Sequence, residues 1–190
     1  RTAATREALV GAARPLFAQH GYAAVSTDQI ARAAGVTRGA LYHQFAGKEE
    51  LFAALLEQME AEIADRLAAR LGSVDDPLAL LRDGIDGWLE ACAQPEVRRI
   101  VLIEAPAALG WQRWREVGRR YGVGLVEATL QLLVDGEVIA DQPVRPLAHV
   151  LIGALEEAAL YVAGAADREE ATAEVRASLL RLVEGLLLRT

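Results

Sequence analysis

The chain has 190 residues, of which 53% are hydrophobic and 5% aromatic, and it carries a formal net charge of −7 at pH 7. A chain of this length suits one or two folded domains that bury roughly 70% of the surface exposed by the unfolded form. Its longest stretch without Asp, Glu, Lys or Arg is Pro15–Thr27, which is shorter than the roughly 18 apolar residues of a membrane-spanning helix. We therefore expect a soluble protein with no membrane partner.

Ala and Leu dominate the composition, which favours helices over the β-branched and aromatic residues typical of sheets. The expected fold class is all-α. Cys92 is the single cysteine, which excludes an internal disulfide and is typical of a reducing compartment. We expect a cytoplasmic protein.

The charge is unevenly distributed along the chain. Residues 1–48 carry six basic and two acidic side chains, a net charge of +4, and the rest of the chain carries −11. A basic segment beside an acidic one is typical of a protein that binds a polyanion with one part and repels it with the other. Charge alone leaves open that both segments are ordinary solvated surfaces.

Three helices are predicted in the basic segment. The first covers Thr5–His20, where apolar residues recur every three or four positions and Gly21 provides a stop. The second is short, with Thr27 as its N-cap and Gly35 at its end. The third, Arg38–Phe45, follows after a tight turn. Two short helices joined by a turn that contains glycine predict a helix-turn-helix motif.

The third predicted helix has two different sides. Leu41 and Phe45 are four residues apart and predict the side that faces the core. The opposite side carries Arg38, Gly39, Tyr42 and His43. An arginine can bind a guanine edge or a phosphate with two parallel hydrogen bonds, and a glycine lets the helix approach the DNA groove closely. Lys48 begins the next helix, where it can share a phosphate with free backbone N–H groups. We interpret this surface as one that reads DNA.

The stretch TDQIARAAGVTRGALYHQFAGKEELF, Thr27–Phe52, resembles the DNA-binding domain of the TetR family of bacterial transcriptional regulators. The matching features are the Thr-capped helix, the Ala-Gly-Val turn, the Leu-Tyr-x-x-Phe helix and the Lys-Glu-x-Leu start of the fourth helix. Together with Phe17, Gly21 and Tyr22, the resemblance covers about the first 55 residues.

The resemblance implies a helix-turn-helix domain at residues 1–47 and a ligand-binding and dimerisation domain at residues 48–190, with about nine helices in total. It also implies that the contacts to a double-stranded DNA operator fall on Thr27, Thr37, Arg38, Gly39, Tyr42, His43 and Lys48.

Longer helices are predicted after Lys48. Asp76 followed by Pro77 is a strong helix start, and Pro95 opens a further helix. The expected helices are Lys48 to about Leu71, Pro77 to about Ala93, Pro95 to near Pro106, Ala108 to about Val134, Pro143–Ala165 and Arg168–Arg189.

The apolar residues of Pro143–Ala165 cluster on one broad side of that predicted helix. Those of Arg168–Arg189 sweep an arc of roughly 160°, which is wider than a single core-facing stripe requires. A second copy of the chain could cover the excess in a two-fold four-helix bundle, and burial by the chain's own body is the alternative. The resemblance implies that these helices form the homodimer interface. The candidate interface residues are Leu147, Leu151, Leu155, Tyr161, Val175, Leu179, Leu182 and Leu186. A dimer would place two reading helices about 34 Å apart, as a palindromic operator requires.

The resemblance also implies that helices of the body hold a small-molecule effector. The candidate lining residues are Met59, Ile63, Trp88, Cys92, Ile100, Glu104, Trp111, Trp114 and Tyr121. An aromatic cavity with Glu104 as a rare polar group suits a lipophilic, cationic ligand. Each of these residues equally suits an ordinary core position, and Glu104 could instead pair with a nearby arginine such as Arg98 or Arg99.

An enzyme would need a converging nucleophile or base, and the chain has only three histidines and no metal-ligand spacing. We therefore expect no catalytic residue, no metal and no cofactor. The predicted function is a ligand-responsive repressor that binds its operator as a homodimer and is released by a small lipophilic effector. In a bacterium it would be cytoplasmic and associated with the nucleoid when bound to DNA. The alternative is a helical small-molecule carrier or adaptor without operator binding.

Overall fold

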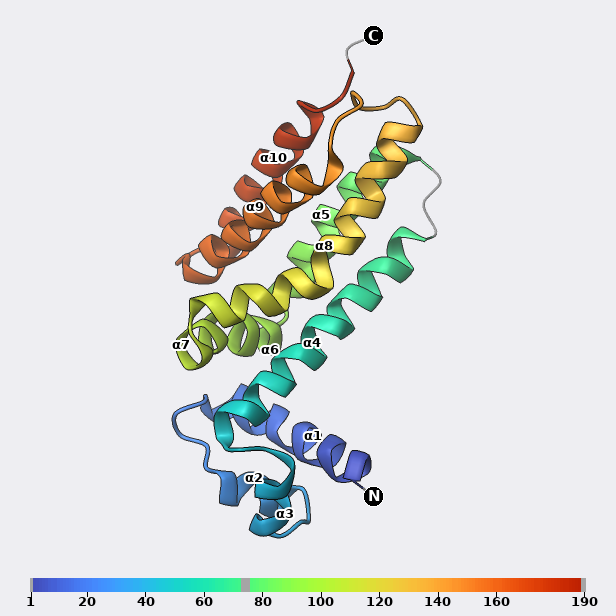
Figure 1. Cartoon of the computed structure of the whole chain (residues 1–190). Helices are drawn as coiled ribbons and strands as arrows, with labels where there is room; N and C mark the ends of the chain where they lie inside the picture. The colour runs from blue at the N-terminus through green and yellow to red at the C-terminus, as the bar shows by residue number, and fades with distance from the viewer. Residues whose placement is uncertain (1, 73–75, 189–190) are drawn as a thin grey trace. The chain divides into compact units, whose positions relative to one another are not determined.

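The computed structural model describes residues 2–72 and 76–188, and Figure 1 shows these residues as a set of helices. The helices are α1 (Thr2–His20), α2 (Thr27–Ala33), α3 (Arg38–Gln44), α4 (Lys48–Leu71), α5 (Pro77–Ala93), α6 (Pro95–Val97), the π-helix η1 (Arg98–Glu104), α7 (Ala105–Leu109), α8 (Trp111–Asp135), α9 (Val144–Gly164) and α10 (Arg168–Glu184). Because α6, η1 and α7 follow one another without a break, the described residues form nine continuous helical segments. The all-α prediction is confirmed.

The chain groups into two compact units. Unit 1 comprises Arg1–Met59 and Pro95–Val117, and unit 2 comprises Glu60–Gln94 and Gly118–Thr190. The helices α4 and α8 each contribute residues to both units. The predicted boundary at residue 48 separates a DNA-binding domain from a ligand-binding domain by function, whereas these units are groups of residues in contact. The functional boundary stays a prediction.

Aromatic packing holds α1 and α4 together in unit 1. The ring of Phe17 in α1 meets Phe52 of α4 edge-on, with 4.9 Å between the ring centroids. Tyr22 completes the cluster at 5.9 Å from Phe17 and 5.0 Å from Phe52. Leu41 and Phe45 are buried as well, which confirms that this side of the third helix faces the core. The opposite side of α3 is left to solvent.

The segment α6–η1–α7 passes the point at which the sequence predicts a stop. A stop near Pro106 is wrong, because the helix continues to Leu109. The N–H of Ala105 donates to the carbonyl of Ile100, five residues earlier, which is a π-type turn. This wider turn places Pro106, which has no N–H, in the first turn of α7, where a proline is tolerated. Gly110 then ends the segment with a φ of 82°, a conformation that favours glycine.

In unit 2, α5, α9 and α10 pack against one another around an apolar core. Figure 1 shows α9 and α10 lying side by side. The helix α10 ends at Glu184 and is shorter than predicted, and Arg189 lies outside the described residues. Beyond the helix, Leu186 lies in a turn and Leu187 forms an isolated antiparallel bridge with Ile139.

Among the described residues, α9 is the one helix that is long and apolar enough to cross a membrane by length and composition alone. Such a helix is weak evidence, because the core helix of a folded domain passes the same test. One side of α9 is buried against unit 2 itself, including Ala148, Leu151 and Glu156. Core packing therefore accounts for part of its apolar character.

Candidate functional site

The start of α2 differs from the prediction by one residue. Ser26, rather than Thr27, is the N-cap: its hydroxyl accepts a hydrogen bond from the N–H of Gln29 at 3.2 Å. The side chain of Gln29 in turn accepts from the N–H of Ser26 at 2.8 Å, which completes a capping box. The prediction that Thr27 is the N-cap is therefore wrong, and the Thr27 hydroxyl can bond to a different residue.

The turn into α3 follows the predicted pattern. Gly35 has a φ of 67°, and its N–H donates to the carbonyl of Arg32. Thr37 is the N-cap of α3, as predicted, since its hydroxyl accepts from the N–H of Ala40 at 3.1 Å. These local contacts set the angle at which α3 leaves α2.

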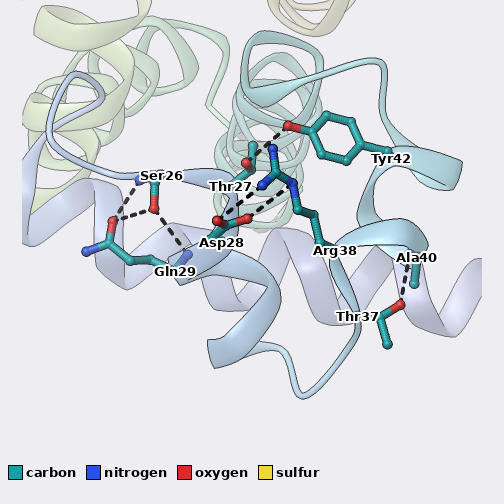
Figure 2. A network of polar contacts seen from close by, with 8 residues as sticks. All are labelled: Ser26, Thr27, Asp28, Gln29, Thr37, Arg38, Ala40 and Tyr42. Carbon is teal, nitrogen blue, oxygen red and sulfur yellow. Dashed lines mark hydrogen bonds and ion pairs between the residues drawn. The ribbon is translucent and has the colours of Figure 1, made fainter.

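Four side chains at the α2–α3 junction form a connected network on the surface (Figure 2). The hydroxyls of Thr27 and Tyr42 are 3.3 Å apart and share a hydrogen bond. The Arg38 guanidinium forms an ion pair with Asp28, with 3.4 Å between Nε and Oδ1, and lies 5.5 Å from the centre of the Tyr42 ring. The hydrogen bond with Thr27, followed by that with Arg38, lowers the pKa of Tyr42 below its ordinary value. Arg38 and Tyr42 are thus preorganised and still exposed to solvent.

The same surface includes two further predicted residues. A Cβ atom placed on Gly39 would meet only the Thr37 hydroxyl, at 3.9 Å. Packing within the chain therefore does not explain this glycine. His43 is exposed at the end of α3. The structure thus places Thr27, Thr37, Arg38, Gly39 and Tyr42 around the α2–α3 junction, and His43 in the last turn of α3.

Lys48 has a structural role that sequence reasoning missed. Its Nζ donates to the carbonyls of Tyr22 at 2.8 Å and Val25 at 2.9 Å, and it lies 4.3 Å from the centre of the Tyr22 ring. An ammonium group has three N–H donors, and two are used inside the protein. Lys48 therefore ties the start of α4 to the loop before α2.

Glu104 is placed at a junction within unit 1. Its carboxylate accepts hydrogen bonds from the N–H of Tyr22 at 3.2 Å and from Nε of Arg99 at 3.1 Å. The pairing with Arg99 was one of the alternatives that the sequence left open. Arg113 forms a second bridge in this unit, to the carboxylate of Glu50 at 2.9 Å. These contacts attach η1 and α8 to the residues around the first and fourth helices.

The candidate effector residues are divided between the two units: Met59, Ile100, Glu104, Trp111 and Trp114 belong to unit 1, whereas Ile63, Trp88, Cys92 and Tyr121 belong to unit 2. Trp111 is exposed and its ring centroid lies 4.8 Å from that of the buried Trp114. Trp88 uses its Nε1–H to bond the carbonyl of Leu155 at 3.0 Å. Burial raises the pKa of the Cys92 thiol, which keeps it neutral.

Two buried glutamates in unit 2 were missed by sequence reasoning. Glu60 of α4 and Glu156 of α9 are only 6% and 8% exposed. Burial, followed by the charge of Glu156, raises the pKa of Glu60 to about 7. A signal for Glu60 was present, because Leu56, Glu60 and Ile63 follow the four-and-three spacing of one helix side.

The fold and the α2–α3 junction together define the class of protein: an all-helical protein with a helix-turn-helix motif whose second helix presents Arg38 and Tyr42 to solvent. Two family models match the chain. "Bacterial regulatory proteins, tetR family" matches residues 9–55, and "Tetracyclin repressor-like, C-terminal domain" matches residues 78–186. The chain belongs to the TetR family of transcriptional regulators.

Individual relatives agree with this assignment. The crystal structure of a TetR-family transcriptional regulator from Pectobacterium atrosepticum is 34% identical, covers 99% of this chain and 96% of that one, and has a TM-score of 0.89. The TetC protein of transposon Tn10 from Escherichia coli is 26% identical over 97% of this chain and 91% of its own length. The transcriptional regulator AcrR of Shigella flexneri is 37% identical over 52% of this chain, and the match spans 46% of AcrR.

Replacing Lys48 by Met tests its structural role, because Met keeps an unbranched apolar side chain and removes both hydrogen bonds. Charge-assisted hydrogen bonds contribute about 2 kcal/mol, and we expect the free energy of unfolding to fall by about that amount. Urea denaturation measures it. The exposed Arg32→Met variant removes the same charge without those bonds and should change stability little. Unchanged stability in Lys48→Met would contradict the role.

Replacing Glu60 by Gln tests the raised pKa. The folded chain holds this proton up to about pH 7, whereas the unfolded chain releases it near 4.5, so the parent loses stability as the pH rises through this interval. We expect Glu60→Gln to gain about 3 kcal/mol over the parent between pH 4.5 and pH 8. Urea denaturation across this range measures the gain. Glu157→Gln, an exposed neighbour of Glu156, should follow the parent, and parallel pH profiles for Glu60→Gln and the parent would show that Glu60 titrates normally.

Proposed function

We propose that the chain is a ligand-responsive repressor, in which residues 1–47 bind a palindromic operator and residues 48–190 bind an effector and form the homodimer. The observation that supports operator binding best is the exposed, preorganised pair of Arg38 and Tyr42 on α3. The carrier or adaptor alternative is not favoured, because it does not require this surface and the chain belongs to a family of regulators. The protein acts in the bacterial cytoplasm, at the nucleoid when bound to DNA.

A contact between Arg38 and a DNA base would be stronger than the ion pair that Arg38 forms with Asp28 in the free protein. An exposed ion pair such as Arg38–Asp28 contributes about 0–1 kcal/mol, because water screens it. A bidentate contact between an arginine and a guanine contributes about 1–3 kcal/mol of discrimination. Arg38 therefore exchanges Asp28 for a base edge with a net gain. Thr27, Thr37, Tyr42 and His43 contact phosphate oxygens, and Gly39 permits close approach.

The proposed dimer interface is supported by exposed apolar side chains on α9 and α10. Val150 and Tyr161, which lie three turns apart on one side of α9, are 63% and 57% exposed, and Leu182 of α10 is 51% exposed. Leu151 and Leu179, also in the predicted set, are buried in the core of unit 2 and support the helices instead. Leu147, Leu155, Val175 and Leu186 are partly buried against that core. A second copy would cover the exposed side in a two-fold interface.

Release from the operator requires an effector that prefers the arrangement unable to bind DNA. Near-complete switching needs a preference of about 10⁴-fold, or about 5.5 kcal/mol. The hydrogen bond from Tyr22 to Glu104 supports coupling, because it links η1 to the loop after α1 within unit 1. A shift of η1 would therefore disturb the segment that precedes the helix-turn-helix.

Selection from a random duplex library tests operator binding. We expect the parent to enrich a palindrome, with affinity that falls steeply as salt rises because phosphate contacts release counterions. Arg38→Ala should bind the selected duplex about 10- to 100-fold more weakly, as the loss of a base contact predicts. Arg168→Ala, an exposed arginine on α10, serves as the charge-matched control and should bind normally. Failure of the parent to enrich any sequence at low salt would overturn the proposed function.

A charge placed on the exposed side of α10 tests the dimer. We expect Leu182→Asp to shift the protein from dimer to monomer in sedimentation equilibrium, because a buried unpaired carboxylate at the interface is unfavourable. Leu132→Asp, which alters an exposed leucine of α8, should leave the dimer intact. A dimer that survives in Leu182→Asp would place the interface elsewhere.

A further inference from the structure

We propose that Asp28 is a specificity-determining residue of the operator surface, and that it accepts a hydrogen bond from the N4 amino group of the cytosine paired with the guanine that Arg38 binds. The two side chains then recognise one G·C base pair together, each binding one of its bases. This role rests on the proposed function, because it assigns a base to a residue on the same DNA surface. Asp28 is not among the residues for which the sequence predicts a DNA contact.

Asp28 and Arg38 lie next to each other on the exposed side of the α2–α3 junction (Figure 2). Oδ1 of Asp28 is 3.4 Å from Nε of Arg38, and Oδ2 is 3.5 Å from Nη1. The two side chains come from different helices, α2 and α3, and are 53% and 64% exposed. A carboxylate acceptor and a guanidinium donor are therefore presented side by side, where a base pair can reach both.

A G·C base pair carries the complementary pattern in the major groove. Guanine presents two acceptors, N7 and O6, and cytosine presents its N4 amino donor beside them. Arg38 can donate to the guanine acceptors, and the Asp28 carboxylate can accept from the cytosine amino group. An A·T base pair does not fit this arrangement, because thymine presents the acceptor O4 and a methyl group where Asp28 needs a donor.

The proposed exchange at Arg38 creates the need for this donor. When the guanidinium turns from Asp28 to a guanine, the carboxylate loses its ion-pair partner. An ionised carboxylate can only accept hydrogen bonds, so its new partner must be a donor. The cytosine amino group lies next to the guanine edge that Arg38 binds, and it is the donor that the same base pair offers in the major groove.

Folding stability gives little reason for a carboxylate at this position. An exposed ion pair is screened by water and contributes little. Residues 1–48 contain only one other acidic side chain, Glu7. A negative charge on a DNA-binding surface is repelled by the phosphates. A hydrogen bond to cytosine offsets this repulsion at the correct base pair and leaves it uncompensated elsewhere, and an unpaired charge in the wrong complex is one source of specificity.

Base analogues in both half-sites of the selected operator duplex test the contact without changing the protein. 7-Deazaguanine lacks the N7 acceptor and identifies the guanine that Arg38 binds, because it should weaken binding of the parent but not of Arg38→Ala. N4-methylcytosine opposite that guanine keeps the base pair and replaces the major-groove N–H by a methyl group. We expect the parent to bind this duplex about tenfold more weakly in fluorescence anisotropy. 5-Methylcytosine, which keeps the N–H, should have a smaller effect.

Asp28→Ala assigns the effect to the carboxylate. This variant should bind the unmodified duplex and the N4-methylcytosine duplex with affinities within about twofold of each other. Glu7→Ala removes the same charge from residues 1–48 and should keep the preference of the parent. If Asp28 served only to stabilise the first turn of α2, its loss would weaken binding to both duplexes by one factor and leave the preference unchanged.

Equal affinity of the parent for the two duplexes overturns the role of Asp28, and so does a preference that survives in Asp28→Ala. The role is also overturned if no guanine responds to 7-deaza substitution in the parent alone. In these cases the parent still selects a palindrome, and the proposed function stands. A parent that selects no duplex contradicts the proposed function itself.

Discussion

The packing of Phe17 against Phe52 and Tyr22 is the constraint on which the candidate DNA surface depends. These rings join the end of α1 to the start of α4, and the helix-turn-helix lies between them in the chain. Lys48 adds a polar tie by donating to the carbonyls of Tyr22 and Val25. With both ends of the segment held, α2 and α3 have little freedom, and the exposed side of α3 is presented in a defined orientation.

Much of this arrangement could be predicted from local patterns. The glycine turn before α3, the Thr37 cap and the core-facing side of the third helix each depend on residues within one or two turns. The N-cap of α2 could have been chosen in the same way, although Ser26 and Thr27 are adjacent and both can cap a helix. Only Ser26 has a glutamine three residues later, and Gln29 completes the capping box through the reciprocal bond. The helix that passes Pro106 was also missed, because a π-type turn relieves the usual effect of proline.

The buried polar groups show why site residues are harder to predict than helices. Glu104 stood out because it interrupts an apolar stretch. Its carboxylate, however, accepts hydrogen bonds from Arg99 and from the N–H of Tyr22 within unit 1. Glu60 was hidden among the acidic residues of α4, most of which face water. Its spacing with Leu56 and Ile63 predicts the buried side, but the raised pKa also depends on Glu156, which lies far away in the sequence, and a pattern read along one helix contains no information about that partner.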